Sequence, residues 1–341
     1  MRKSVLLTSL FIGLIMVACV SSEAYAPPVF PVIKQMDSKR LSEGLVLHYP
    51  FDMCIDGDNL FVLALAEKTW LQVYNKKTGA YVGSFISKGQ GPGEIVTGTM
   101  LHYDASRRSI AIYDETSVKL LTYSIGDDLE NLLILDSEKS FYMLDGIVRR
   151  VWPLDNSCYL VDGQLGGKLG EQKRFQLLSH DEVTYEFNEY SVTSEEEKLA
   201  FLSPGIALSP DKGKMAVGTL YGGILELYDI SEKLSLKDIR RFYPPILRYS
   251  SGAIRSTEET IWGFSTLCAT SSNLYTVLIG GKDPNLLNNI SVFNWNGEEQ
   301  IRYETDCSVF RLCSSEEEPD KLYGIAVSDD KEFYLVSFDL K

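Results

Sequence analysis

The chain has 341 residues, which is long enough for one large domain or two ordinary ones. A content of 45% hydrophobic and 23% charged residues is typical of a folded globular protein and excludes general disorder. The formal net charge of -14 argues against a nucleic-acid partner, whose phosphates need a basic face. It also argues against general adhesion of the protein surface to anionic lipid headgroups.

The first residues have the pattern of a secretory signal. Arg2 and Lys3 give a positive start, and residues 5–18 form an almost unbroken apolar run that is short for a transmembrane helix. The run ends in Met16-Val17-Ala18-Cys19, which resembles the lipobox of bacterial lipoproteins, with Met in place of the usual Leu. The resemblance implies cleavage before Cys19, diacylation of this cysteine and membrane attachment through the acyl chains only.

Two neighbouring features refine this prediction. A cut after Ala24-Tyr25-Ala26 is the alternative, but it would leave Pro27 at the new terminus, which signal peptidases disfavour. Val20 is not the Asp that retains lipoproteins in the inner membrane, so the resemblance implies an outer-membrane lipoprotein facing either the periplasm or the exterior. We predict a signal peptide at residues 1–18, lipidated Cys19 with a linker over 19–40, and one folded domain over 41–341.

Five further cysteines have no zinc-like spacing. Cys54, Cys158, Cys268, Cys307 and Cys313 form neither a CxxC motif nor a Cys/His set, and we predict no metal site. Cysteines within apolar strands usually behave as small buried hydrophobes. A disulfide between Cys307 and Cys313 remains the less favoured alternative, because a disulfide requires strict geometry.

A repeat extends over the whole chain. The five-residue pattern apolar-x-x-(aromatic or Leu)-(Asn/Ser/Asp) recurs six times, and its copies end at Asn75, Ser124, Ser179, Asp229, Asn294 and Asp339. Successive copies are roughly 45–65 residues apart, which is the spacing of propeller blades rather than of helical repeats.

Other apolar runs surround each copy of the pattern. Two precede it, often joined by turn residues such as those at 56–59, and in five of the six units another follows it. The sixth unit lacks this last run, and residues 45–49 are a spare apolar segment before the first unit. We therefore predict an all-β, six-bladed β-propeller with four-stranded blades, closed by an N-terminal strand that pairs with the last blade and leaves no open edge. A large β-sandwich would not need six equivalent units and a spare strand.

The first unit carries a family resemblance. Residues 60–95 resemble an NHL-type repeat in the strand ending Val73-Tyr74-Asn75, in Thr78-Gly79 and in the strand 81–85. With the glycine-rich link at 89–94, the unit also resembles the TolB-like six-bladed propeller lipoproteins of bacteria. The resemblance implies the propeller fold but no particular activity, because most members of that family have no established biochemical role.

The glycine-rich link is a weak phosphate-loop candidate. No Lys-Ser/Thr follows residues 89–93 and no helix is expected there, so the glycines are interpreted as a sharp turn between blades. Glu94 is then expected near the mouth of the central channel, where its carboxylate could meet a ligand or cap a strand.

Other sequence features indicate no catalytic set. Asp56-Gly57-Asp58 imitates the start of a calcium loop but lacks the later Glu, which favours a hairpin turn. The three histidines, His48, His102 and His180, lie on separate units. They suggest neither a Ser/His/Asp arrangement nor a metal site, and we predict no catalytic residue and no cofactor.

The links between blades concentrate cationic and aromatic residues. Arg149 and Arg150 lead into the third unit, and Arg248, Arg255 and Trp262 lie in the long link to the fifth. On one face of a propeller these residues could bind an anionic or sugar-like ligand or a protein partner. The alternative is that the arginines form ordinary salt bridges with neighbouring Asp and Glu.

Two functions remain open at this point. The first is a non-catalytic binding or scaffolding propeller, anchored at the cell envelope, with a protein, peptide or glycan on its loop face and no nucleic acid. The second is a propeller hydrolase or lyase resembling the calcium-dependent lactonases, in which Asp, Asn and Glu side chains surround an ion in the channel. The lack of a recognisable catalytic set favours the first.

Overall fold

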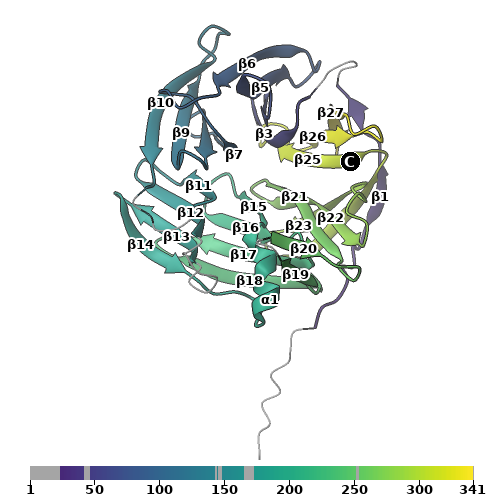
Figure 1. Ribbon diagram of the computed structural model, residues 1–341. Coiled ribbons are helices and arrows are strands. Elements are labelled where there is room, and N and C mark those ends of the chain that lie inside the picture. Colours follow the sequence, from purple (N-terminus) through teal and green to yellow (C-terminus); the bar gives the residue numbers. More distant parts are fainter. Residues whose placement is uncertain are drawn as a thin grey trace, which may run out of the picture.

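Six β-sheets form a ring around a central axis in the computed structural model (Figure 1). The structure describes residues 24–41, 47–142, 144, 148–164, 173–250 and 253–340. Each blade contains four consecutive antiparallel strands, except that the last blade takes its outer strand from the N-terminal segment. The predicted all-β, six-bladed propeller is confirmed.

The strands of the blades follow one another along the chain. Blade 1 contains β3 (Pro50–Asp56), β4 (Asn59–Ala64), β5 (Thr69–Asn75) and β6 (Tyr81–Ser87), and blade 2 contains β7 (Gly98–Asp104), β8 (Ser109–Asp114), β9 (Lys119–Ile125) and β10 (Leu133–Ser140). Blade 3 contains β11 (Arg150–Pro153), β12 (Cys158–Gln164), β13 (Lys173–Ser179) and β14 (Glu182–Phe187), and blade 4 contains β15 (Gly205–Leu208), β16 (Lys214–Gly218), β17 (Gly223–Ile230) and β18 (Leu234–Tyr243). Blade 5 contains β21 (Trp262–Ala269), β22 (Asn273–Gly281), β23 (Asn289–Asn294) and β24 (Glu299–Thr305), and blade 6 contains β25 (Ser308–Ser314), β26 (Lys321–Val327) and β27 (Phe333–Asp339).

The repeated five-residue pattern has a structural role in every blade. Its aromatic or leucine position is at most 4% exposed in all six copies, at Tyr74, Tyr123, Leu178, Tyr228, Phe293 and Phe338. In blades 1, 3 and 5 its last residue ends the third strand and leads into the turn to the fourth. The side chain of Asn75 accepts hydrogen bonds from the backbone N–H groups of Lys77 and Thr78, at 3.1 and 3.0 Å, as an Asx turn requires. The pattern therefore encodes one core side chain in every blade and, in blade 1, also the turn that follows it.

The hydrophobic core lies between adjacent blades rather than at one centre. One cluster joins blades 1 and 2 through residues such as Phe61 and Ile112, and another joins blades 6 and 1 through Tyr323 and Leu60. Both faces of the middle strands are buried, as the six consecutive buried residues of β8 show. Each blade therefore depends on a neighbour on either side.

Ring closure uses the N-terminal segment, as predicted, but at a different position. The outer strand of blade 6 is β2 (Lys39–Arg40), which pairs antiparallel with β27. Of the expected closing strand at 45–49, Leu47 forms a single bridge to Phe333, His48 and Tyr49 are not in a strand, and residues 45–46 lie outside the described residues. Leu47 is buried between blades 6 and 1, so its apolarity reflects burial at the closure.

The N-terminal segment also adds a strand to blade 5. β1 (Ile33–Met36) pairs in parallel with β24 as a fifth strand, and Figure 1 shows it along the outside of the ring. Both β1 and β2 precede residue 41, where we expected the folded domain to begin. Cys19 and the expected signal peptide lie outside the described residues, and within the described part of the chain no helix is long and apolar enough to span a membrane.

Three short elements were not predicted. α1 (Glu195–Lys198) and the 3-10 helix η1 (Leu199–Leu202) lie between blades 3 and 4, and a hairpin of β19 (Leu247–Ser250) and β20 (Ala253–Ser256) lies between blades 4 and 5. Ser194 caps the acidic run at 195–197, which opens α1: the Ser194 Oγ accepts a hydrogen bond of 3.1 Å from the N–H of Glu197.

A buried ion pair joins blades 3 and 4. The Arg174 guanidinium on β13 pairs with the Glu226 carboxylate on β17 and donates to the Tyr228 hydroxyl at 3.0 Å. Arg174 and Glu226 are 4% and 0% exposed, and the guanidinium lies 4.4 Å from the ring centre of Phe201. This pair lies within the blade interface, away from the ring axis, so we interpret it as structural.

Substitution of Glu226 by Gln should destabilise the protein strongly. The change leaves the Arg174 charge buried without its counter-charge, which should reduce the free energy of unfolding by about 3 kcal/mol or more. Urea denaturation measures this loss. The matched control is Asp229→Asn, which breaks an exposed pair with Lys237 at 3.0 Å and should cost less than about 1 kcal/mol. Equal losses in the two variants would contradict a special role for the buried pair.

Candidate functional site

A cavity of about 550 Å³ follows the ring axis and is lined by the innermost strand of every blade. These strands are β3, β7, β11, β15, β21 and β25, and each forms one edge of its sheet. An innermost strand pairs on one side only, so its other edge and its inward side chains face the channel. Polar side chains on these strands are therefore the candidates for ligand contact.

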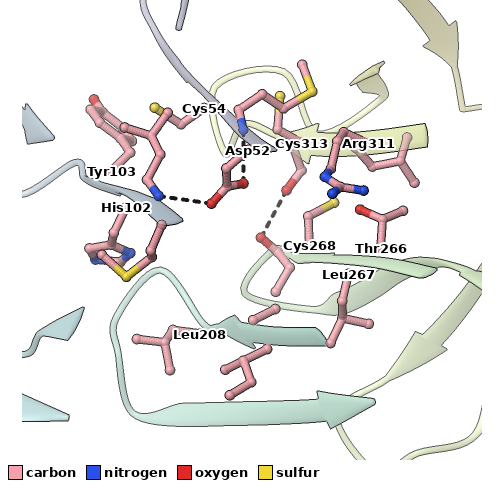
Figure 2. A pocket seen from close by; sticks show the side chains of 18 of the residues that line it. Asp52, Cys54, His102, Tyr103, Leu208, Thr266, Leu267, Cys268, Arg311 and Cys313 are labelled. Atoms are coloured by element: carbon pink, nitrogen blue, oxygen red, sulfur yellow. Dashed lines mark hydrogen bonds between the residues drawn. The ribbon is translucent and has the colours of Figure 1, made fainter. Parts of the chain in front are cut away.

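Four of the innermost strands contain a bulge near the start. The register shifts between Pro50 and Asp52 in β3, between Gly98 and Met100 in β7, between Val309 and Arg311 in β25, and twice between Trp262 and Thr266 in β21. A bulge lets two residues oppose one and changes the direction in which the following side chain points. Asp52 and Arg311 directly follow such shifts, and Figure 2 shows both at the cavity on different strands.

Asp52 is a carboxyl group deep within the ring. It accepts hydrogen bonds from the backbone N–H groups of Met53, at 2.9 Å, and Leu101, at 3.0 Å. Burial raises the pKa of Asp52 above its ordinary value, although these hydrogen bonds and the positive charges of Arg311 and Arg150 oppose the rise. Among the described residues Asp52 forms no direct ion pair, and Arg311 and Arg150 act on it from farther away.

Arg311 is the cation next to Asp52. Its Nε donates to the carbonyl oxygen of Phe51 at 2.7 Å and its Nη1 to that of Phe310 at 2.8 Å. Burial lowers the pKa of Arg311, and Asp52 opposes this, but an arginine side chain stays protonated in proteins. Among the described residues the second terminal nitrogen, Nη2, has no hydrogen-bond acceptor, so it is available to an anion in the cavity.

Arg150 contributes a second guanidinium from β11. Its Nε and Nη2 donate to one carboxylate oxygen of Asp162, on the neighbouring strand β12, at 2.8 and 2.5 Å. This pairing fixes the side chain where it lines the cavity, 5.5 Å from the ring centre of Trp152. The channel thus receives guanidinium groups from blades 3 and 6.

An aromatic cluster lies beside Arg311, where blades 6 and 1 meet. The ring centre of Tyr49 is 5.5 Å from Phe51, 5.8 Å from Phe310 and 5.6 Å from Phe333, in edge-to-face arrangements. Phe51 lines the cavity, and the Arg311 guanidinium lies 4.2 Å from the ring centre of Phe310. Tyr49 is 52% exposed, so the cluster presents an aromatic surface next to the channel arginine.

The remainder of the cavity is rich in sulfur and contains one histidine. Cys54, Cys268 and Cys313 line it from blades 1, 5 and 6, as Figure 2 shows. Burial raises the pKa of all three thiols, that of Cys268 to about 12, which disfavours the reactive thiolate form. All five described cysteines are free, including Cys307 and Cys313.

His102 is neutral at physiological pH. Burial and the nearby positive charge of Lys212 lower the pKa of its imidazole to about 4, against a smaller opposing effect of Asp104. The Nε2 atom of His102 is buried, and it has no hydrogen-bond partner among the described residues.

Of the six predicted ligand residues, only Arg150 lines the cavity. The Arg149 side chain does not line the cavity; its guanidinium lies against Gly163. A Cβ atom at Gly163, whose φ is +73°, would collide with this guanidinium. Glu94 folds into the glycine-rich link and accepts a hydrogen bond of 2.8 Å from the N–H of Gly91. Its carboxylate therefore shapes the link between blades 1 and 2.

The other three predicted residues lie outside the channel. Arg248 and Arg255 are exposed on the β19–β20 hairpin. Trp262 stacks against Tyr221 with ring centres 5.1 Å apart. Asp52, Arg311 and Tyr49 were not predicted. A charged residue within an apolar inner strand, as in Phe310-Arg311-Leu312-Cys313, is a signal that could have indicated Asp52 and Arg311, whereas no local signal indicates Tyr49.

The cavity does not provide an evident cation site. Within the described residues no three His, Cys, Asp or Glu side chains are grouped so that they could hold a metal ion. The Asp-Gly-Asp sequence at 56–58, which resembles the start of a calcium-binding loop, forms a β-hairpin turn, with Asp56 opposite Asn59 and a φ of +53° at Gly57. Asp52 has two guanidinium groups as its charged neighbours, which would repel a divalent cation.

Fold and site together define a six-bladed propeller with a ligand-sized channel. A family model for TolB-like 6-blade propeller-like proteins matches residues 30–317, and the chain belongs to this family. No curated protein sequence matches the chain.

Solved structures show the same fold at low sequence identity. A protein from Bacteroides fragilis inferred to be exported is 14% identical, with a TM-score of 0.57 over 93% of this chain and 98% of that one. A calcium-binding protein, regucalcin, from Agrobacterium tumefaciens is 12% identical, with a TM-score of 0.50 over 90% and 95%. A luciferin-regenerating enzyme is 11% identical, with a TM-score of 0.52 over 89% and 95%.

Stability should depend on His102 between pH 6.5 and 4. In this range the unfolded chain binds a proton at the imidazole and the folded protein does not, so stability falls as the pH is lowered through it. A shift of this size corresponds to at most about 3 kcal/mol. Urea midpoints measured from pH 7 to 4 should fall less steeply for His102→Gln than for the wild type. If the urea midpoints of the variant and the wild type changed with pH in parallel, His102 would have the same pKa in the folded and unfolded states, which would contradict the prediction.

Proposed function

We propose that this protein is an exported, lipid-anchored binding protein whose channel receives the acidic end of a carbohydrate. The observation that carries the proposal is the Arg311 guanidinium, which has a free donor in the cavity and an exposed aromatic surface beside it. The cavity volume of about 550 Å³ lies within the range of small-molecule sites.

The arginines favour an acidic ligand. Arginine binds carboxylate or sulfate oxygens through a planar set of donors, and its hydrogen bonds to charged groups are roughly twice as strong as neutral ones. Arg311 is held by backbone carbonyls and Arg150 by Asp162, so both guanidinium groups are fixed before the ligand arrives. Such preorganisation reduces the entropy lost on binding.

The surroundings of the arginines favour a sugar. The exposed face of Tyr49 can pack against the C–H face of a pyranose ring, while hydroxyl groups need polar partners in the cavity. Ser265, Thr266 and Ser315 line the cavity, and serine and threonine hydroxyl groups can both donate hydrogen bonds to the hydroxyl groups of a sugar and accept them.

The sequence supports the anchoring part of the proposal. The apolar run at 5–18 and the lipobox-like residues before Cys19 are the features expected of an outer-membrane lipoprotein. The similar Bacteroides fragilis protein, inferred to be exported, agrees with this localisation. The acyl chains would be the only membrane-inserted part.

The second candidate is a calcium-dependent propeller hydrolase. The likeness to regucalcin and to a luciferin-regenerating enzyme raises this possibility. The channel residues do not fit a calcium site, because Asp52 is flanked by Arg311 and Arg150 instead of further oxygen ligands. We therefore favour binding without catalysis.

Replacement of Arg311 by Lys should weaken acid recognition. A lysine keeps the charge but loses the fork of donors, and the affinity for a uronic-acid trisaccharide should fall about 10- to 100-fold, as expected for a hydrogen bond to a charged group. Calorimetric titration measures this, with the neutral trisaccharide of the same linkage as the ligand control. Arg248→Lys, outside the channel, is the matched protein control. No binding of the acidic sugar by the wild type, or equal binding of both sugars, would contradict the proposal.

Replacement of Tyr49 by Ala tests the aromatic surface separately. The side chain is 52% exposed, so thermal stability should change little, while the affinity for the acidic trisaccharide should fall about 5- to 10-fold. A variant that binds the trisaccharide as tightly as the wild type would restrict the site to the acid group.

Calcium should be dispensable. Elemental analysis of natively purified protein should show far less than one calcium ion per chain, and chelation should leave both the melting temperature and sugar binding unchanged. A stoichiometric ion together with lactone turnover that stops on chelation would establish the second candidate instead.

A further inference from the structure

The β19–β20 hairpin has one buried and one exposed face. Leu247 is 8% exposed and Ile254 packs against the core cluster that contains Phe201 of η1. These residues hold the hairpin on the short helices, since β19 contacts both α1 and η1. The opposite face of the hairpin carries Arg248 and Arg255.

The two arginines are direct cross-strand partners. In the register of the hairpin Arg248 lies opposite Arg255, and both are exposed. Directly opposed side chains have Cβ atoms about 5 Å apart, and like charges in this arrangement destabilise a sheet. Neither arginine forms an ion pair or hydrogen bond with any other described residue, although the chain has 47 acidic residues. Two guanidinium groups this close can share the oxygens of one phosphate group.

The hairpin lies at the corner of the ring where the described chain begins. The Tyr25 hydroxyl donates to a carboxylate oxygen of Glu197 in α1 at 3.2 Å, and the backbone N–H of Ala26 donates to the carbonyl of Arg241 in β18 at 3.0 Å. Figure 1 shows the N-terminal segment reaching the ring beside α1 and the hairpin. Tyr25 therefore joins the N-terminal segment to the helix on which the hairpin rests.

The length of the preceding chain limits how far this corner can lie from a membrane. Tyr25 comes six positions after Cys19, a stretch that spans at most about 20 Å when fully extended. An acyl chain on Cys19 would therefore hold the α1 corner close to the bilayer surface.

We infer that the exposed face of the β19–β20 hairpin contacts the phosphate groups of the lipid headgroups beside the anchored N-terminus. The inference rests on the proposed lipidation of Cys19. The neighbourhood of the arginine pair suits an interface of this kind, because the apolar side chain of Ile246, two positions before Arg248, is 39% exposed.

The contact orients the protein without providing its membrane affinity. The net charge of -14 still opposes general adhesion to an anionic surface, and the acyl chains supply the binding. The arginine pair selects which side of the ring faces the bilayer. This leaves the aromatic cluster at the junction of blades 6 and 1 away from the anchored corner at blade 4.

Hydrogen exchange of the full-length lipidated protein in vesicles tests this inference. The amides of residues 247–250 and 253–256 should exchange about threefold or more slowly in phosphatidylethanolamine–phosphatidylglycerol vesicles than in vesicles of the phosphate-free lipid digalactosyldiacylglycerol. The double variant Arg248→Gln/Arg255→Gln should lose this difference. The control Lys237→Gln/Lys321→Gln removes the same charge from side chains that are 54% and 44% exposed and should keep it.

The remaining outcomes separate the alternatives. Equal exchange of the hairpin in both lipids would overturn the phosphate contact while leaving the anchoring intact. Inorganic phosphate that slows exchange equally well in the glycolipid vesicles would show a site for soluble anions instead. A full-length chain that does not float with either kind of vesicle would overturn both the anchoring and the hairpin contact, whereas the sugar-binding proposal would be unaffected.

Discussion

Every blade of this protein is apolar on both faces, and the ring follows from that constraint. The middle strands, such as β8 with six consecutive buried residues, have no solvent-facing side. A twisted sheet with two apolar faces is stable only when it packs between two other sheets. A series of such blades therefore leaves no apolar face exposed only when the last blade packs against the first. The innermost strands β25 and β3 make this contact, and the N-terminal segment then supplies the outer strand of blade 6.

The same constraint explains why ligand chemistry is placed on the axis. The faces of each blade are occupied by packing, and the outer strands are exposed and mostly polar. Only the innermost strands combine a rigid backbone with unpaired edges and a sheltered space. Bulges at the start of β3 and β25 turn Asp52 and Arg311 into that space at little cost to the blade interfaces. The rigid ring thus holds charged groups in a partly buried position, which favours selective binding of an oppositely charged ligand.

Proteins that share the propeller fold of this chain have different functions. Structures only 11–14% identical to this chain share its architecture and include both a calcium-binding protein and an enzyme. At such low sequence identity the fold can be inferred from these structures, but the role of the channel residues cannot. The arginines of the cavity and the aromatic cluster beside it therefore have to be assessed on their own geometry.

The sequence by itself determined the class of fold, the number of blades and the position of nearly every strand. This was possible because each blade repeats one local pattern, in which a buried residue is followed by a polar one, as Tyr74 is by the turn residue Asn75 and Phe293 by Asn294.

Only the tertiary structure shows which strand closes the ring, because β2 is a two-residue strand without an apolar pattern of its own. It also decided which arginine faces the channel: Arg149 and Arg150 are adjacent in sequence, but alternation along β11 and the space above Gly163 send them in different directions. Local patterns report what is buried, whereas the direction of a polar side chain depends on bulges and on neighbours from other blades, which no single segment encodes.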